Sequence, residues 1–523
     1  MSEFNTTGLG SLSPEVTKAI QKLAREHFVE RLWQKDPTLW GLEPTRADSI
    51  RSRLGWLTSV SAMRSQTRSL MDFADAARRD GFTHALLLGM GGSSLSAELL
   101  RHTFGVRPSF LDLAVLDSTD PVEIAAAEQR VDIRRTLFVV STKSGTTTET
   151  IAFFRYFFER AREARGRPAG EQFVAITDLG TPLERLAKEH DFRRTFLNPS
   201  DIGGRYSALS LFGLVPAALL GIDLMAFLER AERMAERLTP DRPAEENPGV
   251  TLGGIIGAAA MVGRDKLTLS FSRSLGTLGG WVEQLVAESL GKEGKGVVPV
   301  DGEPLGQPAV YGNDRLFVAI TLAGEEEGRE PALAFLRAAG HPVLKITLRD
   351  KLDLAGEFLR WEVATAAAGT LLGINPFDEP NVQEAKDHTA RLLAAYQTTG
   401  TRSEAAPDIE EDGIALFGSP GRSPADGLTT HLGRARAGDY LALMAYLPRE
   451  PGTDALLQSL RLAIRDRLRV ATTLGYGPRL LHSTGQLHKG GPPNGLFIQI
   501  THGGSRDLPI PSAPYSFKTL QHA

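Results

Sequence analysis

The residues Ser141–Thr150 combine five threonines, two serines, a lysine and a glycine between two predicted elements. The apolar run 136–141 predicts a buried strand and 151–160 predicts a helix. A loop at such a junction offers free backbone N–H groups and the positive end of a helix dipole to an anion. Hydroxyls add donors and Lys143 adds a point charge. The spacing G-x-x-x-x-G-K-[ST] of nucleoside triphosphate sites is missing, which favours a phosphate monoester on a small molecule. A capped helix with solvated threonines is the alternative.

A second loop of this kind follows the apolar residues of the stretch 86–94, where Gly89, Gly91 and Gly92 precede Ser93. Glycines let the backbone approach a ligand, and Ser93 can donate a hydrogen bond at a helix start. A tight turn with a capping serine explains the same residues equally well. The spacing is not the G-x-G-x-x-G of dinucleotide sites. Two such loops on neighbouring strands nevertheless favour one shared site for a phosphorylated sugar.

Two charged side chains could perform chemistry beside these loops. Arg205 follows two glycines in the stretch 201–207 and could stabilise developing negative charge. Gln284 and Glu288 are four residues apart and therefore share one face of a predicted helix. Glu288 precedes a glycine-rich turn and could act as a general base in a partly buried site. For each of these residues taken alone, a surface ion pair or a solvated helix face is the stronger interpretation.

Two later segments contain further candidate groups. Lys386 ends the stretch 375–386, and its residues alone do not decide between a surface and a functional role. His482 and His488 lie in the polar loop 481–491 and could exchange protons near neutral pH. A metal site is a weak interpretation because the chain has no cysteine and no H-E-x-x-H motif.

The composition bounds these interpretations. The chain has 523 residues, so we expect two or more domains. A net charge of −4 gives no reason to expect nucleic acid or an anionic membrane as a partner. The lack of cysteine excludes disulfides and thiolate nucleophiles and fits an intracellular location. The apolar segment Leu211–Leu228 is interrupted by Pro216, Gly221 and Asp223, which predicts a buried helix and a turn rather than a membrane span.

Short apolar runs alternate with helical patterns in both halves of the chain, which predicts an α/β fold with parallel sheets. The predicted strands are 84–89, 112–116, 136–141, 172–177, 266–271, 315–321, 342–347, 439–446 and 495–501. The segment 236–250 is typical of a linker, and the polar stretch 400–436 indicates an insertion or a mobile loop. Because ligands bind at the carboxyl ends of strands in such sheets, we expect the chemistry in loops that follow strands.

Taken together, the motifs resemble one known family, glucose-6-phosphate isomerase. The pieces that carry the resemblance occur in that family's order: Gly91–Ser93, Ser141–Thr150, Gly203–Ser207, Glu288–Lys292 and Asn375–Asp378. The closing piece His482–Gly491 makes the chain most similar to the isomerase half of bacterial transaldolase/glucose-6-phosphate isomerase fusion proteins. This similarity implies a transaldolase partner, fused or separate. Such proteins continue beyond the last residues of this chain, so we expect a fragment of a longer protein.

The resemblance implies two SIS-type domains, each a three-layer α/β/α sandwich with a mainly parallel sheet. We expect an N-terminal helical extension (1–45), a first SIS domain with the phosphate loops (46–235) and a second SIS domain with the insertion (250–523). It also implies a homodimer with residues of both subunits near each site, and a cytoplasmic location. The implied reaction interconverts D-glucose 6-phosphate and D-fructose 6-phosphate without a metal or organic cofactor.

The resemblance also implies roles for individual residues. The substrate is bound by these residues of the loops and helices: Gly92, Ser93, Thr142, Lys143, Ser144, Thr147, Gly204 and Gln284. Arg205 would stabilise an enediolate, Glu288 would move the proton between C1 and C2, and Lys386 would assist ring opening. His482 is our choice for the ring-opening histidine, with His488 and His388 as alternatives.

The sequence departs from the family at two points. The ring-opening histidine usually follows the catalytic glutamate closely, but the next histidine after Glu288 is His341. At Glu379 a glutamine is common in the family, and a carboxylate pointing into the site would repel a phosphate dianion. Three alternatives to the implied function follow. They are an isomerase for another phosphosugar such as mannose 6-phosphate, a non-catalytic phosphosugar-binding protein, and a scaffold for a partner enzyme. The joint presence of Glu288, Arg205 and Lys386 disfavours the non-catalytic role.

Overall fold

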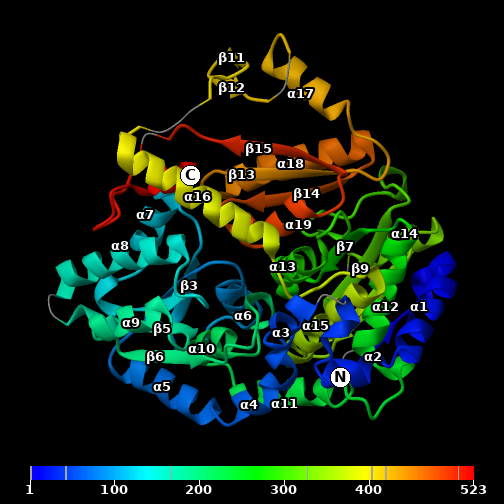
Figure 1. The fold of residues 1–523 in the computed structure, drawn as a ribbon, viewed down its shortest axis with the longest axis horizontal. Coiled ribbons are helices and arrows are strands. Elements are labelled where there is room, and N and C mark those ends of the chain that lie inside the picture. Colours follow the sequence, from blue (N-terminus) through cyan, green and yellow to red (C-terminus); the bar gives the residue numbers. More distant parts are fainter. Residues whose placement is uncertain are drawn as a thin grey trace.

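The computed structural model describes residues 3–41, 44–165, 168–326, 328–401, 405–418, 421–504 and 506–523. Within them, three sheets with mainly parallel strands are surrounded by helices (Figure 1). The predicted α/β class is therefore confirmed. None of the helices in the described ranges combines the length and the apolar composition needed to cross a membrane.

The first sheet is wholly parallel and carries both predicted phosphate loops. In sheet order its strands are β3 (Asp112–Leu116), β2 (His84–Gly89), β4 (Thr136–Ser141), β5 (Phe173–Asp178) and β6 (Arg194–Asn198). The crossover helices are α6 (Leu95–Phe104), α7 (Pro121–Arg130), α8 (Thr148–Arg165) and α9 (Pro182–Glu189). The first four strands match the predictions to within one residue. We did not predict β6, a half-exposed edge strand that starts with Arg194.

The second sheet is parallel except at one edge. In order its strands are β1 (Glu3–Asn5), β10 (Val343–Leu348), β9 (Arg315–Leu322), β7 (Lys266–Phe271) and β8 (Val298–Val300). The strand β1 pairs antiparallel with β10 and completes this edge of the sheet. The N-terminal extension, which we predicted to be helical, therefore also contains a strand of three residues. The associated helices are α12 (Pro248–Met261), α13 (Leu278–Leu290), α14 (Glu330–Ala338) and α15 (Leu354–Leu372).

A separate, three-stranded parallel sheet contains the last two predicted strands. Its order is β14 (Ala471–Tyr476), β13 (Tyr440–Tyr446) and β15 (Gly495–Thr501), with α18 (Pro451–Leu468) and α19 (Gly485–Gly490) between them in the chain. The stretch 400–436 holds a hairpin of β11 (Ile409–Glu411) and β12 (Ile414–Leu416) and the helix α17 (Pro424–Leu432). Residues 402–404 and 419–420 of that stretch lie outside the described residues. The division of the chain into domains stays a prediction.

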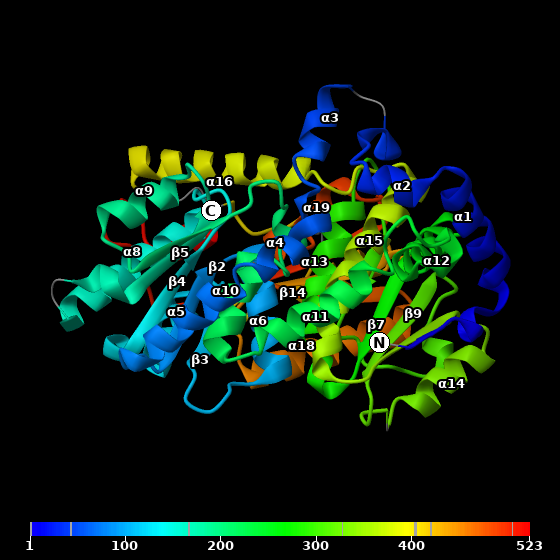
Figure 2. The ribbon, with the colours of Figure 1, turned by 90° about the horizontal axis from the view of Figure 1, so that it is seen from below.

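The remaining helices pack around the sheets. They are α1 (Ser13–Arg25), α2 (Phe28–Trp33), α3 (Pro44–Arg51), α4 (Ser59–Arg64), α5 (Thr67–Arg79), α10 (Leu211–Leu220), α11 (Leu224–Ala235), α16 (Pro380–Thr399) and α20 (Phe517–His522). The buried helix α10 ends at Gly221, which confirms the predicted core helix and turn. Figure 2 shows α16 lying along one edge of the molecule, above the elements of the first sheet.

Close packing of α12 against α15 builds much of the core behind the second sheet. The helix α12 is apolar on nearly all sides, whereas the equally buried α15 also carries Glu357, Arg360 and Glu362. The backbones approach closely at Gly253, where an added Cβ would lie 2.5 Å from the Ala364 carbonyl oxygen. Glycine is required there because any side chain would force the two helices apart. This rigid core supports α13, the helix that carries Gln284 and Glu288.

Candidate active site

The two predicted phosphate loops lie side by side, because β2 and β4 are neighbours in the first sheet. The turn Gly91–Ser93 follows β2, and the Ser141 hydroxyl at the end of β4 donates a hydrogen bond to the Ser93 carbonyl at 2.8 Å. The Thr142 and Thr147 hydroxyls are 2.8 Å apart just before α8 begins. The structure therefore gathers hydroxyls and the N-terminal end of α8 at one edge of the sheet, an arrangement suited to an anion.

Lys143 lies in the same loop, but its ammonium group points to other partners. It forms an ion pair with Asp178 at the end of β5 and donates a hydrogen bond to the Ser200 carbonyl at 2.8 Å. Ser144 is engaged with its neighbour Thr146, with 2.9 Å between the two hydroxyl oxygens. Phosphate binding by Lys143 and Ser144 stays a prediction, since both side chains already have partners within the chain.

Close contact between Gly92 and Gly204 places Arg205 beside this anion site. An added Cβ on Gly92 would lie 2.1 Å from the Gly204 carbonyl oxygen. The Ser207 hydroxyl lies 2.6 Å from that oxygen and 3.2 Å from the Gly92 carbonyl oxygen. Any side chain at position 92 would therefore separate the loop after β2 from the loop that carries Arg205.

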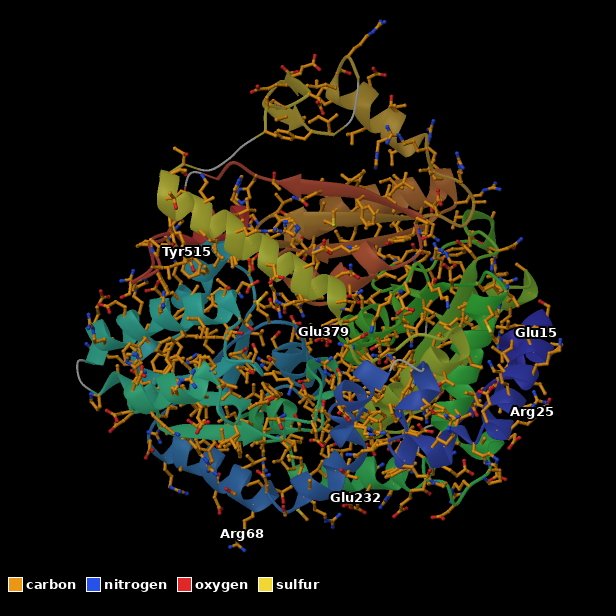
Figure 3. All side chains as sticks on the ribbon, in the orientation of Figure 1. Glu15, Arg25, Arg68, Glu232, Glu379 and Tyr515 are labelled. Carbon is orange, nitrogen blue, oxygen red and sulfur yellow. The ribbon has the colours of Figure 1, made fainter. Side chains whose placement is uncertain are left out.

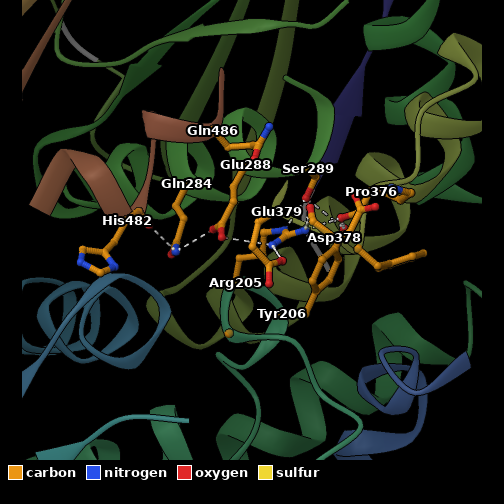
Figure 4. Close-up of polar contacts among 12 residues, drawn as sticks. Arg205, Tyr206, Gln284, Glu288, Ser289, Pro376, Asp378, Glu379, His482 and Gln486 are labelled. Atoms are coloured by element: carbon orange, nitrogen blue, oxygen red, sulfur yellow. Dashed lines mark hydrogen bonds and ion pairs between the residues drawn. The ribbon is translucent and has the colours of Figure 1, made fainter. Parts of the chain in front are cut away.

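Arg205 is almost fully buried and uses every nitrogen of its guanidinium group (Figure 4). Its Nε donates to the Ser289 hydroxyl at 2.8 Å, and its Nη2 donates to the Pro376 carbonyl at 2.8 Å. Its Nη1 lies 3.2 Å from Glu288 Oε1 and 3.0 Å from Glu379 Oε2. The guanidinium is thus fixed between two carboxylates, one of which is the predicted base.

Glu288 lies one helical turn after Gln284 on the buried face of α13. The Gln284 amide donates to Glu288 Oε2 at 3.0 Å and to the His482 carbonyl at 2.8 Å. Burial raises the pKa of Glu288 above its usual range, and the Arg205 charge only partly offsets this. A carboxylate with a raised pKa can accept and return a proton near neutral pH.

His482 lies beside this pair, in the turn Arg479–His482, and contacts an acid that we did not predict. Its Nε2 is 2.9 Å from Oε1 of Glu149, in the first turn of α8. Despite burial, the His482 charge and its hydrogen bond lower the pKa of Glu149. Glu149 belongs to the motif Ser141–Thr150. The signal that could have identified it is an acidic residue in the first turn of a predicted helix.

The two alternative histidines lie elsewhere. The His488 ring packs against Tyr440 and Phe497, with 5.2 Å between its centroid and that of Phe497, and burial lowers its pKa to about 4. His388 is exposed on α16 and contacts Arg391 at 2.9 Å. Of the three candidates, His482 is the one whose backbone carbonyl contacts Gln284, the partner of Glu288, while its ring contacts Glu149.

Lys386 is exposed on α16, and no hydrogen bond or ion pair engages its side chain within the described part of the chain. Its charge nevertheless contributes to the lowered pKa of Glu149, so it faces the His482 side of the site. The start of α16 is fixed by the Asn381 N–H, which donates to Gln486 Oε1 at 2.9 Å. Lys386 is thus placed within electrostatic reach of the site while remaining free to contact a ligand.

Lys292, at the end of the motif Glu288–Lys292, has no role predicted from the sequence and is buried. Its ammonium donates to the Asn375 carbonyl at 2.6 Å and to Asp378 Oδ1 at 2.8 Å. Burial, together with the nearby Arg205 charge, lowers its pKa to about 8. Lys292 therefore fixes the loop that places Glu379 against Arg205. The Glu379 carboxylate contacts Arg205, and its repulsion of a phosphate dianion stays a prediction.

Comparisons with known proteins identify the family of the chain. The model of the phosphoglucose isomerase family matches residues 56–304. A "Probable glucose-6-phosphate isomerase" of Haloarcula marismortui is 31% identical over 352 residues, which is 60% of this chain and 79% of that protein. The glucose-6-phosphate isomerase of Rubrobacter xylanophilus is 30% identical over 387 residues, which is 62% of this chain and 85% of that protein.

Solved structures show the same fold. A hypothetical protein of Thermus thermophilus superposes with a TM-score of 0.64 at 26% identity, over 75% of this chain and all of that one. A glucose-6-phosphate isomerase of Chlamydia trachomatis superposes with a TM-score of 0.56 at 20% identity, over 71% of this chain and 78% of that one. The similarity that the motifs predicted is therefore confirmed at the level of fold and family. The chain belongs to the phosphoglucose isomerase family.

Proposed function

We propose that this protein interconverts D-glucose 6-phosphate and D-fructose 6-phosphate, with Glu288 as the base. The observation that carries the proposal is the contact of the buried Glu288 carboxylate with Arg205 beside the hydroxyl-lined loops. A base, a fixed cation and an anion site are what proton transfer next to a carbonyl on a phosphorylated sugar requires. The proteins that match the chain carry the same activity in their names.

In the proposed mechanism the hydroxyls of Thr142, Thr147 and Ser93 bind the phosphate, which positions the sugar for reaction. Glu288 removes the proton from C2 of open-chain glucose 6-phosphate, and the electron pair forms the C1–C2 double bond of an enediolate. Arg205 stabilises the negative charge that develops on oxygen. The proton that Glu288 carries then returns to C1, and a proton passes from O2 to O1. One carboxyl group serves as base and then as acid.

Ring opening precedes this step, and we assign it to His482 with Lys386. The hemiacetal opens when the O1 hydroxyl loses a proton and the ring oxygen gains one. Glu149 Oε1 lies 2.9 Å from His482 Nε2 and fixes the orientation of the ring. His482 and Lys386 lie beyond residue 304, where the match to the family model ends. Their assignment therefore rests on the resemblance and on the position of His482 beside Gln284.

A homodimer with residues of both subunits near each site is a further proposal that rests on the resemblance. Within one chain, the residues Glu149, Gln284, Glu288 and His482 already lie together. A transaldolase partner, fused or separate, and a cytoplasmic location are further proposals that rest on the resemblance.

The direct test of the function is conversion of fructose 6-phosphate to glucose 6-phosphate by purified protein in the presence of EDTA. Rapid turnover would establish the isomerase without an added metal, and faster turnover of mannose 6-phosphate would instead indicate the alternative substrate. Absence of turnover would contradict the proposal. If sugar phosphate still protected that inactive protein against heat, a binding function would be favoured.

A further inference from the structure

Arg205 shares one nitrogen between two carboxylates, although one would neutralise its charge. The Nη1 atom lies 3.2 Å from Glu288 Oε1 and 3.0 Å from Glu379 Oε2. The hydrogen bond of this Nη1 is made to Glu379, while Glu288 accepts one from Gln284. Glu379 therefore competes with the predicted base, and with any oxyanion formed there, for the same donor.

The position of Glu379 is fixed from several sides. It precedes the first residue of α16, but its side chain does not cap that helix. Arg53 Nη1 lies 3.4 Å from the same Oε2 atom and also donates to the Phe377 carbonyl. The neighbouring Asp378 is held by Lys292 at 2.8 Å. Figure 3 shows Glu379 near the middle of the view, away from the other labelled residues.

The charges around the two carboxylates explain why both can be present. The charged groups that act on the two carboxylates are Arg53, Arg205 and Lys292. Tyr206 lies against Arg205, and Asp378 pairs with Lys292. Burial alone would raise the pKa of Glu379, but the charges of Arg205 and Arg53 lower it overall. The permanent charge of Glu379 in turn adds to the raised pKa of Glu288.

We propose that Glu379 is a positioning residue that holds the Arg205 guanidinium beside Glu288 and sets the pH range in which Glu288 works. This inference rests on the proposed function of Glu288 and goes beyond it by assigning a second carboxylate that does not exchange the substrate proton. Substitutions can separate the charge of Glu379 from its hydrogen bond to Arg205. Glutamine keeps the hydrogen-bond acceptor for Nη1 but removes the charge, whereas alanine removes both.

The experiment compares pH profiles of kcat/KM for the wild type, Glu379→Gln and Glu379→Ala. Glu288 must be ionised to act as a base, so activity falls as the pH drops through its pKa. Loss of the Glu379 charge lowers that pKa, and the acidic limb of Glu379→Gln should move to lower pH by about one unit. Glu379→Ala should in addition lose kcat about tenfold, because Arg205 loses a partner.

The matched control is Glu384→Gln, an exposed glutamate on the same helix, whose profile should equal that of the wild type. Profiles of Glu379→Gln and Glu379→Ala that both superimpose on the wild type would overturn the inference. Carboxyl 13C NMR with labelled glutamate, with the Glu288 signal assigned by its loss in Glu288→Gln, follows the same titration without turnover. It would show a lower Glu288 pKa in Glu379→Gln, or refute the inference even in a protein that failed as an isomerase.

Discussion

The two ends of the candidate site are built in different ways. The phosphate end is one contiguous loop, 141–150, beside the turn Gly91–Ser93, and its exposed groups are neutral hydroxyls and backbone N–H groups. The chemical end draws Arg205, Glu288, Glu379 and His482 from segments that are far apart in the sequence. There, Arg205 and Glu288 are buried, Glu379 and His482 are partly buried, and each is paired with an opposite charge.

This difference assigns different tasks to the two ends. Neutral hydroxyls that bond to each other, as those of Thr142 and Thr147 do, can turn to a ligand and supply binding energy, so changes there should act mainly on KM. Buried, mutually paired charges fix the orientation and the pKa of the groups that move protons, so changes there should act mainly on kcat. Each of the following substitutions tests whether this separation holds.

The largest effect is expected for Glu288→Gln, which keeps the size and the Gln284 contact but cannot accept a proton. We expect kcat to fall about a thousandfold or more, with sugar phosphate binding retained. Steady-state kinetics and calorimetric binding of fructose 6-phosphate provide the two readouts. Activity near the wild-type level would exclude Glu288 as the base.

His482→Ala should lower turnover of the cyclic substrate about a hundredfold, because the ring must open before proton transfer. An analogue that cannot close its ring should lose far less. Rates on the two substrates, measured side by side, check this. Equal losses would place His482 outside ring opening and leave its contact with Glu149 as structural support only.

The same variant tests where each site draws its groups. Mixed with Glu288→Gln under conditions that allow subunit exchange, His482→Ala should give no recovery of activity, because both groups are expected to act within one chain. Recovery to about a quarter of the wild-type rate would show that neighbouring subunits share a site.

At the phosphate end, Thr147→Val should raise KM about tenfold with little change in kcat, because one hydroxyl donor is lost. The measurement is a full saturation curve with fructose 6-phosphate. A comparable fall in kcat without a change in KM would contradict the proposed separation between the two ends.

Lys143→Met should have the smallest effect, with KM changed by less than about threefold. Its ammonium is engaged by Asp178 and the Ser200 carbonyl, so it contributes little to an anion in this arrangement. The same saturation curve applies. A rise in KM larger than that of Thr147→Val would show that the lysine turns to the phosphate when substrate binds.

The fold was predictable wherever the signal is local. Long apolar strands such as β4 and the hydroxyl-rich loop after it were recognised from consecutive residues. The strand β6 was not predicted because it is half-exposed and mixes polar with apolar residues, and β8 because three residues carry little pattern. The strand β14, which lies between two helices, was not predicted either. The assignment of β13 and β15 to a separate sheet depends on pairing partners, which single-strand patterns do not encode.

For the site, the residue types were predictable but their partners were not. The pairing of Arg205 with Glu379 joins positions 174 residues apart, and that of Glu149 with His482 joins positions 333 apart. No local periodicity reports such contacts. The same limit explains why Lys143 was expected at the phosphate: its loop was recognised, but Asp178 on the next strand was not visible as its partner.

Hydrogen exchange at C2 tests the central claim most directly. Glucose 6-phosphate is incubated in D2O with wild-type protein or with Glu288→Gln, and deuterium at C2 of the recovered sugar is measured by NMR. If Glu288 carries the proton between C1 and C2 and this proton exchanges with solvent before it returns to carbon, the wild type should introduce deuterium and the variant should not. Exchange by Glu288→Gln at the wild-type rate would contradict the account.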